Sequence, residues 1–250
     1  MTNPTAAILI IGNEILSGRT QDVNVQFIAK RLADLGIKLE EVRVVPDIPV
    51  HIIDAVNELR AAYTMLFTTG GIGPTHDDIT SECIAAAFGV PWEHHAETFA
   101  VMAEKWGDTF NASRQRMATM PRGAVPIENE ASIAPGFSIG NVHVMAGVPR
   151  IMQSMFVALE PSLPRGQKIE MRAVYGMGVL EGSIAEGLSA IQDRFPGVDL
   201  GSYPFKRDDK WGVALVAKGT NTAALDAAIA ASANLIAAQG VAPVPGEPVL

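Results

Sequence analysis

The stretch that decides the fold is Met65-Leu66-Phe67-Thr68-Thr69-Gly70-Gly71-Ile72-Gly73-Pro74-Thr75-His76-Asp77-Asp78-Ile79-Thr80. Its first residues predict a buried strand, and a loop with three glycines follows them. Glycine permits positive φ and close backbone approach, so the N–H groups of the loop can converge on an anion. A helix should begin near Asp78, and its N-terminus adds unpaired N–H groups and a positive dipole end. The stretch predicts a site for a phosphorylated ligand; the alternative is a tight turn with an aspartate helix cap.

Strand and helix signals alternate on both sides of this loop. Apolar or alternating runs predict strands at residues 6–11, 39–45, 64–69 and 142–145. Helical spacing of apolar residues predicts helices at 25–35, 52–59, 79–88 and 148–159, and residues 91–119 form a less regular helical region. This order is typical of an α/β fold with a parallel, doubly wound sheet.

A second, smaller domain follows a break at residues 161–166, Pro-Ser-Leu-Pro-Arg-Gly. Beyond the break, the pattern predicts a strand at 168–175, a helix at 183–195, strands at 198–205 and 211–217, and a helix at 222–238. We therefore expect a first domain over residues 1–162 and a β-α-β-β-α module over residues 167–240. The proline-rich tail, residues 241–250, should be extended.

Composition restricts the class of protein. A hydrophobic content of 48% with 18% charged residues indicates a globular chain. The net charge of −8, without a cluster of lysine and arginine, argues against nucleic acid as a partner. No apolar run is long enough to span a bilayer and the N-terminus has no signal-peptide pattern, so we expect no membrane association and a cytoplasmic protein. Cys83 is the single cysteine, which excludes a disulfide framework, and we expect it to be a small buried hydrophobe.

Three polar or glycine-rich loops follow predicted strands, at residues 12–24, 70–78 and 146–149. If these strands are parallel, all three loops leave the same edge of the sheet and line one cleft. Asp22 or Asn24 could instead cap the helix that follows. Glu14, just after a buried strand, should lie at the cleft mouth.

These motifs carry a family resemblance. Gly12-Asn13-Glu14-Ile15-Leu16-Ser17-Gly18, the glycine loop, Ala134-Pro135-Gly136-Phe137 and Gly147-Val148-Pro149 resemble the molybdopterin-binding (MoaB/Mog-type) domain, and within it the N-terminal part of the competence/damage-inducible protein A (CinA) family. The resemblance covers about residues 6–160. It implies a three-layer α/β/α fold with a mostly parallel sheet, and the C-terminal module is similar in placement to a KH-type α+β domain.

The resemblance also implies function. Related domains act on molybdopterin, on ADP-ribose as metal-dependent pyrophosphatases, or on FAD. We therefore expect a small-molecule pterin or nucleotide ligand, with hydrolysis of a nucleotide pyrophosphate such as ADP-ribose. The alternatives are a module that binds such a ligand without turnover and a KH-like nucleic-acid binder, which the negative charge disfavours. The family implies a homodimer, and the chain ends before the nicotinamide-mononucleotide deamidase domain of longer relatives, so that activity is expected to be absent.

The expected site residues follow from these motifs. Asp78, Asp22 and Glu14 are the expected catalytic carboxylates, and Asp78 and Glu14 the expected ligands of a divalent Mg, Mn or Co ion. The expected ligand-binding residues are Gly12, Asn13, Asn24, Thr69, Gly70, Gly71, Gly73, Thr75, Asp77, Gly147 and Pro149.

Overall fold

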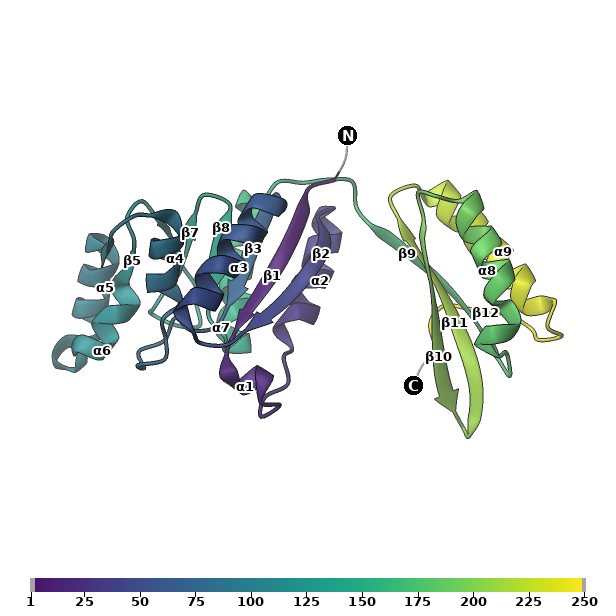
Figure 1. Ribbon diagram of the computed structural model, residues 1–250, viewed down its shortest axis with the longest axis horizontal. Helices are drawn as coiled ribbons and strands as arrows, with labels where there is room; N and C mark the ends of the chain where they lie inside the picture. The colour runs from purple at the N-terminus through teal and green to yellow at the C-terminus, as the bar shows by residue number, and fades with distance from the viewer. Residues whose placement is uncertain (1–2, 249–250) are drawn as a thin grey trace. The chain divides into compact units, whose positions relative to one another are not determined.

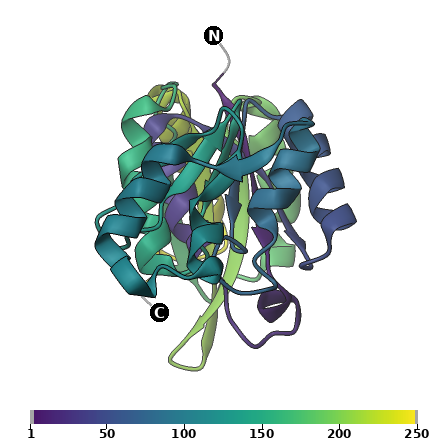
Figure 2. The same cartoon turned by 90° about the vertical axis from the view of Figure 1, so that its left-hand side faces the viewer.

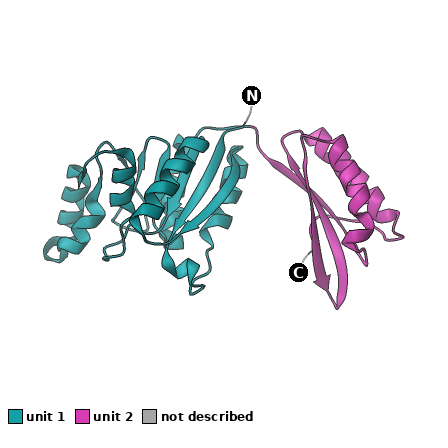
Figure 3. Cartoon of the chain, viewed as in Figure 1, with its two compact units in different colours: residues 1–166 teal, residues 167–250 magenta. Residues whose placement is uncertain are grey.

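The computed structural model describes residues 3–248. The chain divides into two compact units, Met1–Gly166 and Gln167–Leu250 (Figure 3). The division falls at the end of the Pro-Ser-Leu-Pro-Arg-Gly segment. Across residues 3–248, no helix is both long and apolar enough to cross a membrane.

The first unit is built on a six-stranded sheet with the order β2-β1-β3-β8-β7-β6 (Figure 1). The neighbours β2, β1, β3 and β8 are parallel, whereas β7 is antiparallel to both β8 and β6. The mostly parallel sheet is therefore confirmed. Its strands are β1 (Thr5–Ile11), β2 (Lys38–Val45), β3 (Met65–Thr69), β6 (Val125–Ile127), β7 (Gly136–Ile139) and β8 (Val142–Met145).

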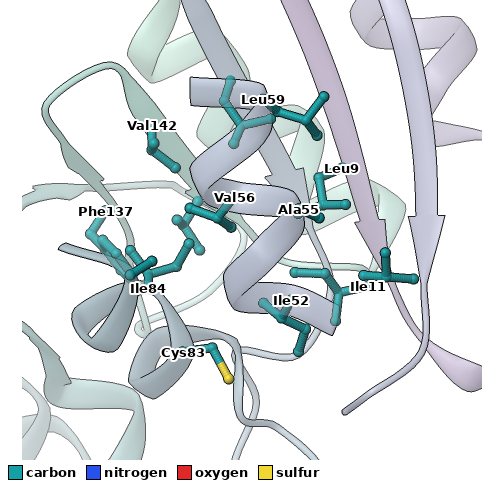
Figure 4. Packing of buried hydrophobic residues seen from close by; sticks show 14 of the residues in the cluster. Leu9, Ile11, Ile52, Ala55, Val56, Leu59, Cys83, Ile84, Phe137 and Val142 are labelled. Carbon is teal, nitrogen blue, oxygen red and sulfur yellow. The ribbon is translucent and has the colours of Figure 1, made fainter. Parts of the chain in front are cut away.

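Helices cover both faces of this sheet, because its central strands are apolar on both faces. Ala7, Leu9 and Ile11 of β1 pack with α3 (Pro49–Ala62) and α4 (Thr80–Phe88). The alternate residues of β1 pack with α2 (Asn24–Leu35) and α7 (Pro149–Leu159). Figure 2 shows the helices on either side of the sheet, and Figure 4 shows the first of these two cores. The result is the three-layer α/β/α arrangement.

Cys83 lies in that first core, as expected for a small hydrophobe. Burial raises the pKa of its thiol to about 11, so the thiolate that would act as a nucleophile is disfavoured.

The region 91–119 differs from its prediction. It begins with β4 (Trp92–His94), which pairs antiparallel with β5 (Thr119–Pro121), so the helical region is bracketed by a two-stranded sheet. The strands β4 to β7 were not predicted. β4, β5 and β6 have three residues each, too few to show an alternation, and glycine and serine interrupt the four residues of β7. The other short elements of this unit are α1 (Asn13–Leu16), α5 (Ala96–Trp106), η1 (Gly107–Thr109), α6 (Ala112–Gln115), η2 (Arg116–Ala118) and η3 (Glu160–Ser162).

The second unit has an antiparallel sheet with the order β10-β11-β9-β12. Val174 of β9 and Leu215 of β11 pack with Ile184 of α8 and Ile236 of α9, so the two helices share one face of the sheet. The strands Asp199–Arg207 and Lys210–Gly219 form a hairpin through Asp208 and Asp209, which both have positive φ, as two-residue hairpins require. The elements are β9 (Glu170–Met177), α8 (Glu181–Arg194), β10 (Asp199–Arg207), β11 (Lys210–Gly219), α9 (Thr222–Ala237) and β12 (Val244–Pro245).

The structure corrects part of the prediction for the C-terminal tail. Within the segment predicted to be only extended, Val244 and Pro245 pair with Tyr175 and Val174, so the tail adds an edge strand to the module. Residues 249 and 250 of the predicted tail lie outside the described residues.

Trypsin should separate the two units. Arg165 and Lys168 are exposed in a segment without regular structure, whereas the basic residues of the 206–210 hairpin lie in a tight turn. We expect limited digestion to cut first after Arg165 or Lys168 and to leave a folded fragment of residues 1–165 or 1–168, as read by mass spectrometry and circular dichroism. The double variant Arg165→Gln/Lys168→Gln should resist this cut. First cleavage at the hairpin would contradict the assignment.

His143 should make the stability of the first unit depend on pH. It lies on β8 beside the Phe67 ring, at 5.2 Å between centroids, and bonds the Ser138 hydroxyl through Nδ1 at 2.8 Å. Burial lowers its pKa to about 4. Below about pH 6.5, His143 is protonated in the unfolded chain but stays neutral in the folded chain. The free energy of unfolding therefore falls between about pH 6.5 and pH 4, by at most about 3 kcal/mol. Urea unfolding at several pH values should show a steeper loss for the wild type than for His143→Gln.

Candidate functional site

Three loops meet at one edge of the sheet. The strands β1, β3 and β8 are adjacent and parallel, so their carboxyl ends share an edge. The Gly70 N–H donates to the Met145 carbonyl at 3.2 Å. A Cβ on Gly70 would collide with the Ile11 carbonyl oxygen, and one on Gly147 would lie 3.3 Å from the Gly70 Cα. The three loops therefore converge on Gly70.

The glycine loop has unpaired N–H groups after Gly70. Gly70 and Gly71 have φ of 101° and 67°. The Thr80 hydroxyl donates to the Gly70 carbonyl at 2.9 Å, and the Thr80 N–H donates to the Gly71 carbonyl at 3.0 Å, which fastens the loop to the start of α4. Within residues 3–248, no protein acceptor takes the N–H of Gly71, Ile72 or Gly73. These donors remain available to an anion.

A first cavity, of about 60 Å³, opens beside the Gly70 end of the loop. Asn24 is only 4% exposed and donates its Nδ2 to the Gly147 carbonyl at 2.8 Å, which ties α2 to the third loop. Its Oδ1 is buried without a hydrogen-bond partner. A buried acceptor without a donor is costly, so a ligand hydroxyl, a ligand N–H or a water is needed there. The lining includes Glu14, Asp22, Asn24, Thr69, Gly70, Gly147 and Pro149.

Asp22 has both of the roles considered for it. Its Oδ1 accepts the Val25 N–H at 2.9 Å and so caps the first turn of α2. It also lines the first cavity together with Glu14. The Glu14 carboxylate lies against Gly12, where a Cβ would come within 2.6 Å of both carboxylate oxygens. Two acidic residues and Asn24 thus line one cavity.

Asp78 lies in a different setting. Its Oδ2 accepts the Thr75 N–H at 2.8 Å and the Thr75 hydroxyl at 2.6 Å. The same hydroxyl lies 2.5 Å from Asp77 Oδ1, and this hydrogen bond is the main cause that lowers the pKa of Asp77. Asp78 lines a second, very small cavity beside Gly73, in which neither Glu14 nor Asp22 takes part. The structure therefore groups Glu14 with Asp22 and places Asp78 at the other end of the loop.

Of the remaining predicted residues, Thr69 and Pro149 line the first cavity, whereas the linings of both cavities lack Gly12, Asn13, Gly71, Thr75 and Asp77. The Asn13 N–H donates to Asp47 Oδ2 at 2.8 Å, which anchors the first loop to the end of β2. Thr69 is buried at the end of β3, and Pro149 begins α7.

A metal would find few protein ligands here. Among residues 3–248, no three side chains of the His, Cys, Asp and Glu types are grouped so that they could hold an ion. Oxygen ligands from one or two carboxylates suit Mg²⁺ when the phosphates of a ligand complete its shell. The donor set around Glu14 and Asp22 fits an ion that arrives with its ligand.

Sequence reasoning missed two features. Arg116 contacts the glycine loop from the irregular 91–119 region, because its Nη2 donates to the Asp78 carbonyl at 3.2 Å. A cavity of about 310 Å³ lies between α5 and the 126–135 loop, and it includes His95, Lys105, Asn129 and Ser132. The family resemblance of Ala134-Pro135-Gly136-Phe137 was the only signal near the second feature, and no local pattern indicated the first.

Comparison with known proteins fits this architecture. Residues 7–165 match the family described as probable molybdopterin binding domain. The chain belongs to this family. Residues 172–245 match the FAD synthase middle domain, and the KH-type label for this module stays a prediction.

Individual relatives agree with the family. A protein of Pyrobaculum calidifontis is 35% identical over 212 residues, which are 80% of this chain and 81% of that protein. A CinA-like protein of Anaeromyxobacter dehalogenans is 38% identical over 57% of this chain and 36% of its own length. The crystal structure of CinA from Thermoplasma acidophilum, a protein of unknown function, matches with a TM-score of 0.61 at 31% identity and covers 65% of this chain and 99% of that one. The expected family resemblance is confirmed.

Gly70 should tolerate no side chain. Gly70→Ala combines strained φ with a collision against the Ile11 carbonyl, so we expect a loss of roughly 3 kcal/mol or more of unfolding free energy. The matched control is Gly89→Ala, since Gly89 has a φ of 65° and an added Cβ would meet no heavy atom within 4 Å. It should lose only about 1 kcal/mol from the backbone conformation. Urea denaturation compares the two, and equal losses would show that the three loops do not converge as described.

Proposed function

We propose that this protein binds a nucleotide or pterin pyrophosphate at the edge where the three loops meet, and that it hydrolyses a nucleotide pyrophosphate such as ADP-ribose with a divalent metal. The observation that carries the proposal is the glycine loop: its Gly71 to Gly73 N–H groups are unpaired among residues 3–248, and at its Gly70 end Asn24, whose Oδ1 has no partner there, lines one cavity with Glu14 and Asp22. Donors suit phosphate oxygens, and the buried acceptor suits a hydroxyl or ring N–H on the same ligand.

The helices add to the attraction for phosphate. Both α4, of nine residues, and α7, of eleven residues, begin at loops of this edge. Their N-terminal N–H groups and positive dipole ends favour an anion. The family match supports a pterin ligand, and the FAD synthase match of the second unit supports a nucleotide.

Each carboxylate then has a role. Glu14 and Asp22 would hold a Mg, Mn or Co ion beside the ligand phosphates, and Asp78 would serve at the Gly73 end of the loop. Such an ion neutralises charge on phosphoryl oxygens and lowers the pKa of a bound water. The chain itself orients the ligand through Asn24 and the loop N–H groups, which stabilise negative charge on the phosphates.

One set of observations favours the second candidate, a module that binds the same ligand without turnover. The Asp78 carboxylate is held by Thr75, and no group of three metal-binding side chains exists among the described residues. Binding requires only the N–H groups and Asn24, whereas hydrolysis requires an activated water as well.

The variant Asp22→Asn distinguishes the two candidate functions, hydrolysis and binding without turnover. Asparagine keeps an oxygen that can accept the Val25 N–H, so α2 stays capped, but the negative charge is lost. With ADP-ribose and Mn²⁺, we expect AMP release to slow by about a hundredfold or more, while the dissociation constant changes little. The matched control is Asp54→Asn on the exposed side of α3, which should leave turnover unchanged.

Chromatography measures AMP release and calorimetry measures binding. Wild-type protein that binds ADP-ribose but releases no AMP with Mg²⁺, Mn²⁺ or Co²⁺ would establish the binding module. Wild-type protein that binds neither ADP-ribose, FAD nor a pterin would overturn the proposed function altogether.

A further inference from the structure

Arg116 places a positive charge at the Gly73 end of the glycine loop. It begins η2 (Arg116–Ala118) and lines the second cavity with Ile72, Gly73 and Asp78. Its Nη2 donates to the Asp78 carbonyl at 3.2 Å, and its guanidinium carbon lies 5.1 Å from the centre of the Trp92 ring. The guanidinium is therefore held in position from two sides.

This guanidinium lacks an anionic partner. Among residues 3–248, no carboxylate forms an ion pair with Arg116, and its Nε is buried without a hydrogen-bond acceptor. The nearest acid along the loop, Asp78, directs its carboxylate to Thr75 instead. A half-buried cation that has lost water without gaining an anion is costly, so an anionic ligand at this position would satisfy it.

The glycine loop connects the two cavities and supplies further hydrogen-bond donors for an anion. Gly70 lines the first cavity, and Ile72 and Gly73 line the second. The unpaired N–H groups of Gly71 to Gly73 lie between them. The four residues Gly70 to Gly73 span no more than about 14 Å, and the two linked phosphoryl groups of the proposed pyrophosphate ligand fit within that length.

We propose that Arg116 binds one phosphoryl group of a diphosphate ligand at the Gly73 end of the loop, while the other phosphoryl group lies at the Gly70 end near Glu14 and Asp22. This inference rests on the proposed function, and it names a binding residue that the family motifs did not indicate. Arginine suits the task because its planar donors can contact two phosphate oxygens at once.

Three variants test it by calorimetry with ADP-ribose and with inorganic diphosphate as probes. Arg116→Met keeps the length of the side chain over Trp92 but removes the charge, and we expect about tenfold or greater weakening of binding for both probes. Arg116→Lys keeps the charge but lacks the planar guanidinium with its paired donors. Its affinity should lie between those of the wild type and Arg116→Met. The matched control is Arg114→Met: Arg114 also stacks on a tryptophan, Trp106, and bonds the Thr109 carbonyl, outside both cavities. It should bind as the wild type does.

The salt dependence of binding distinguishes a charge contact of Arg116 with the ligand from a purely structural role of Arg116. Wild-type affinity should fall with ionic strength more steeply than that of Arg116→Met, because only the wild type has the cation to screen. The inference is overturned if Arg116→Met binds as tightly as the control, or if Arg116→Met and Arg116→Lys lose affinity equally and keep the wild-type salt dependence. If the wild type binds neither probe, nor FAD, nor a pterin, the proposed function fails and the inference about Arg116 fails with it. Thermal unfolding verifies that each variant is folded.

Discussion

The structure depends on the close approach of three strand ends at Gly70. The Ile11 carbonyl of β1 and the Met145 carbonyl of β8 both come against this residue, one by steric contact and the other by a hydrogen bond. A side chain at Gly70 would push β1 away from β3, and the loops after both strands would separate. Because the loops stay together, N–H groups from one chain segment and polar side chains from another can serve the same ligand.

Thr80 connects the glycine loop to the start of α4. It bonds the carbonyls of Gly70 and Gly71, whereas the N–H groups of Gly71, Ile72 and Gly73 have no acceptor among residues 3–248. Three consecutive unpaired N–H groups favour an anion at this loop. From outside the sheet, Arg116 adds to this preference for an anion, whereas Glu14 and Asp22 supply oxygen atoms on the other side. The Gly73 end of the loop therefore has Arg116 and Asp78, the Gly70 end has Glu14 and Asp22, and the whole chain carries a net charge of −8.

Local patterns explain why much of the first unit could be predicted. Apolar runs such as residues 6–11 and glycine loops such as 70–73 contain their own signals, because strand burial and positive φ are properties of neighbouring residues. The short strands β4 to β7 could not be predicted in this way, as each depends on a partner strand. Asp22 shows a third case. The sequence left open whether it caps a helix or faces the cleft, and the structure has one carboxylate in both positions.

The sequence by itself determined the alternation of strands and helices, the glycine loop and the identity of the polar residues at the edge, because each of these follows from side-chain periodicity or backbone freedom within a few residues. Only the tertiary structure decided how those residues are distributed. It placed Glu14 and Asp22 in one cavity and Asp78 in another, left Asn24 Oδ1 and Arg116 Nε without partners, and brought Arg116 to the loop from 38 positions further along the chain than Asp78. Distances between such segments are set by how helices and strands pack on both faces of the sheet, and no short stretch of sequence contains that information.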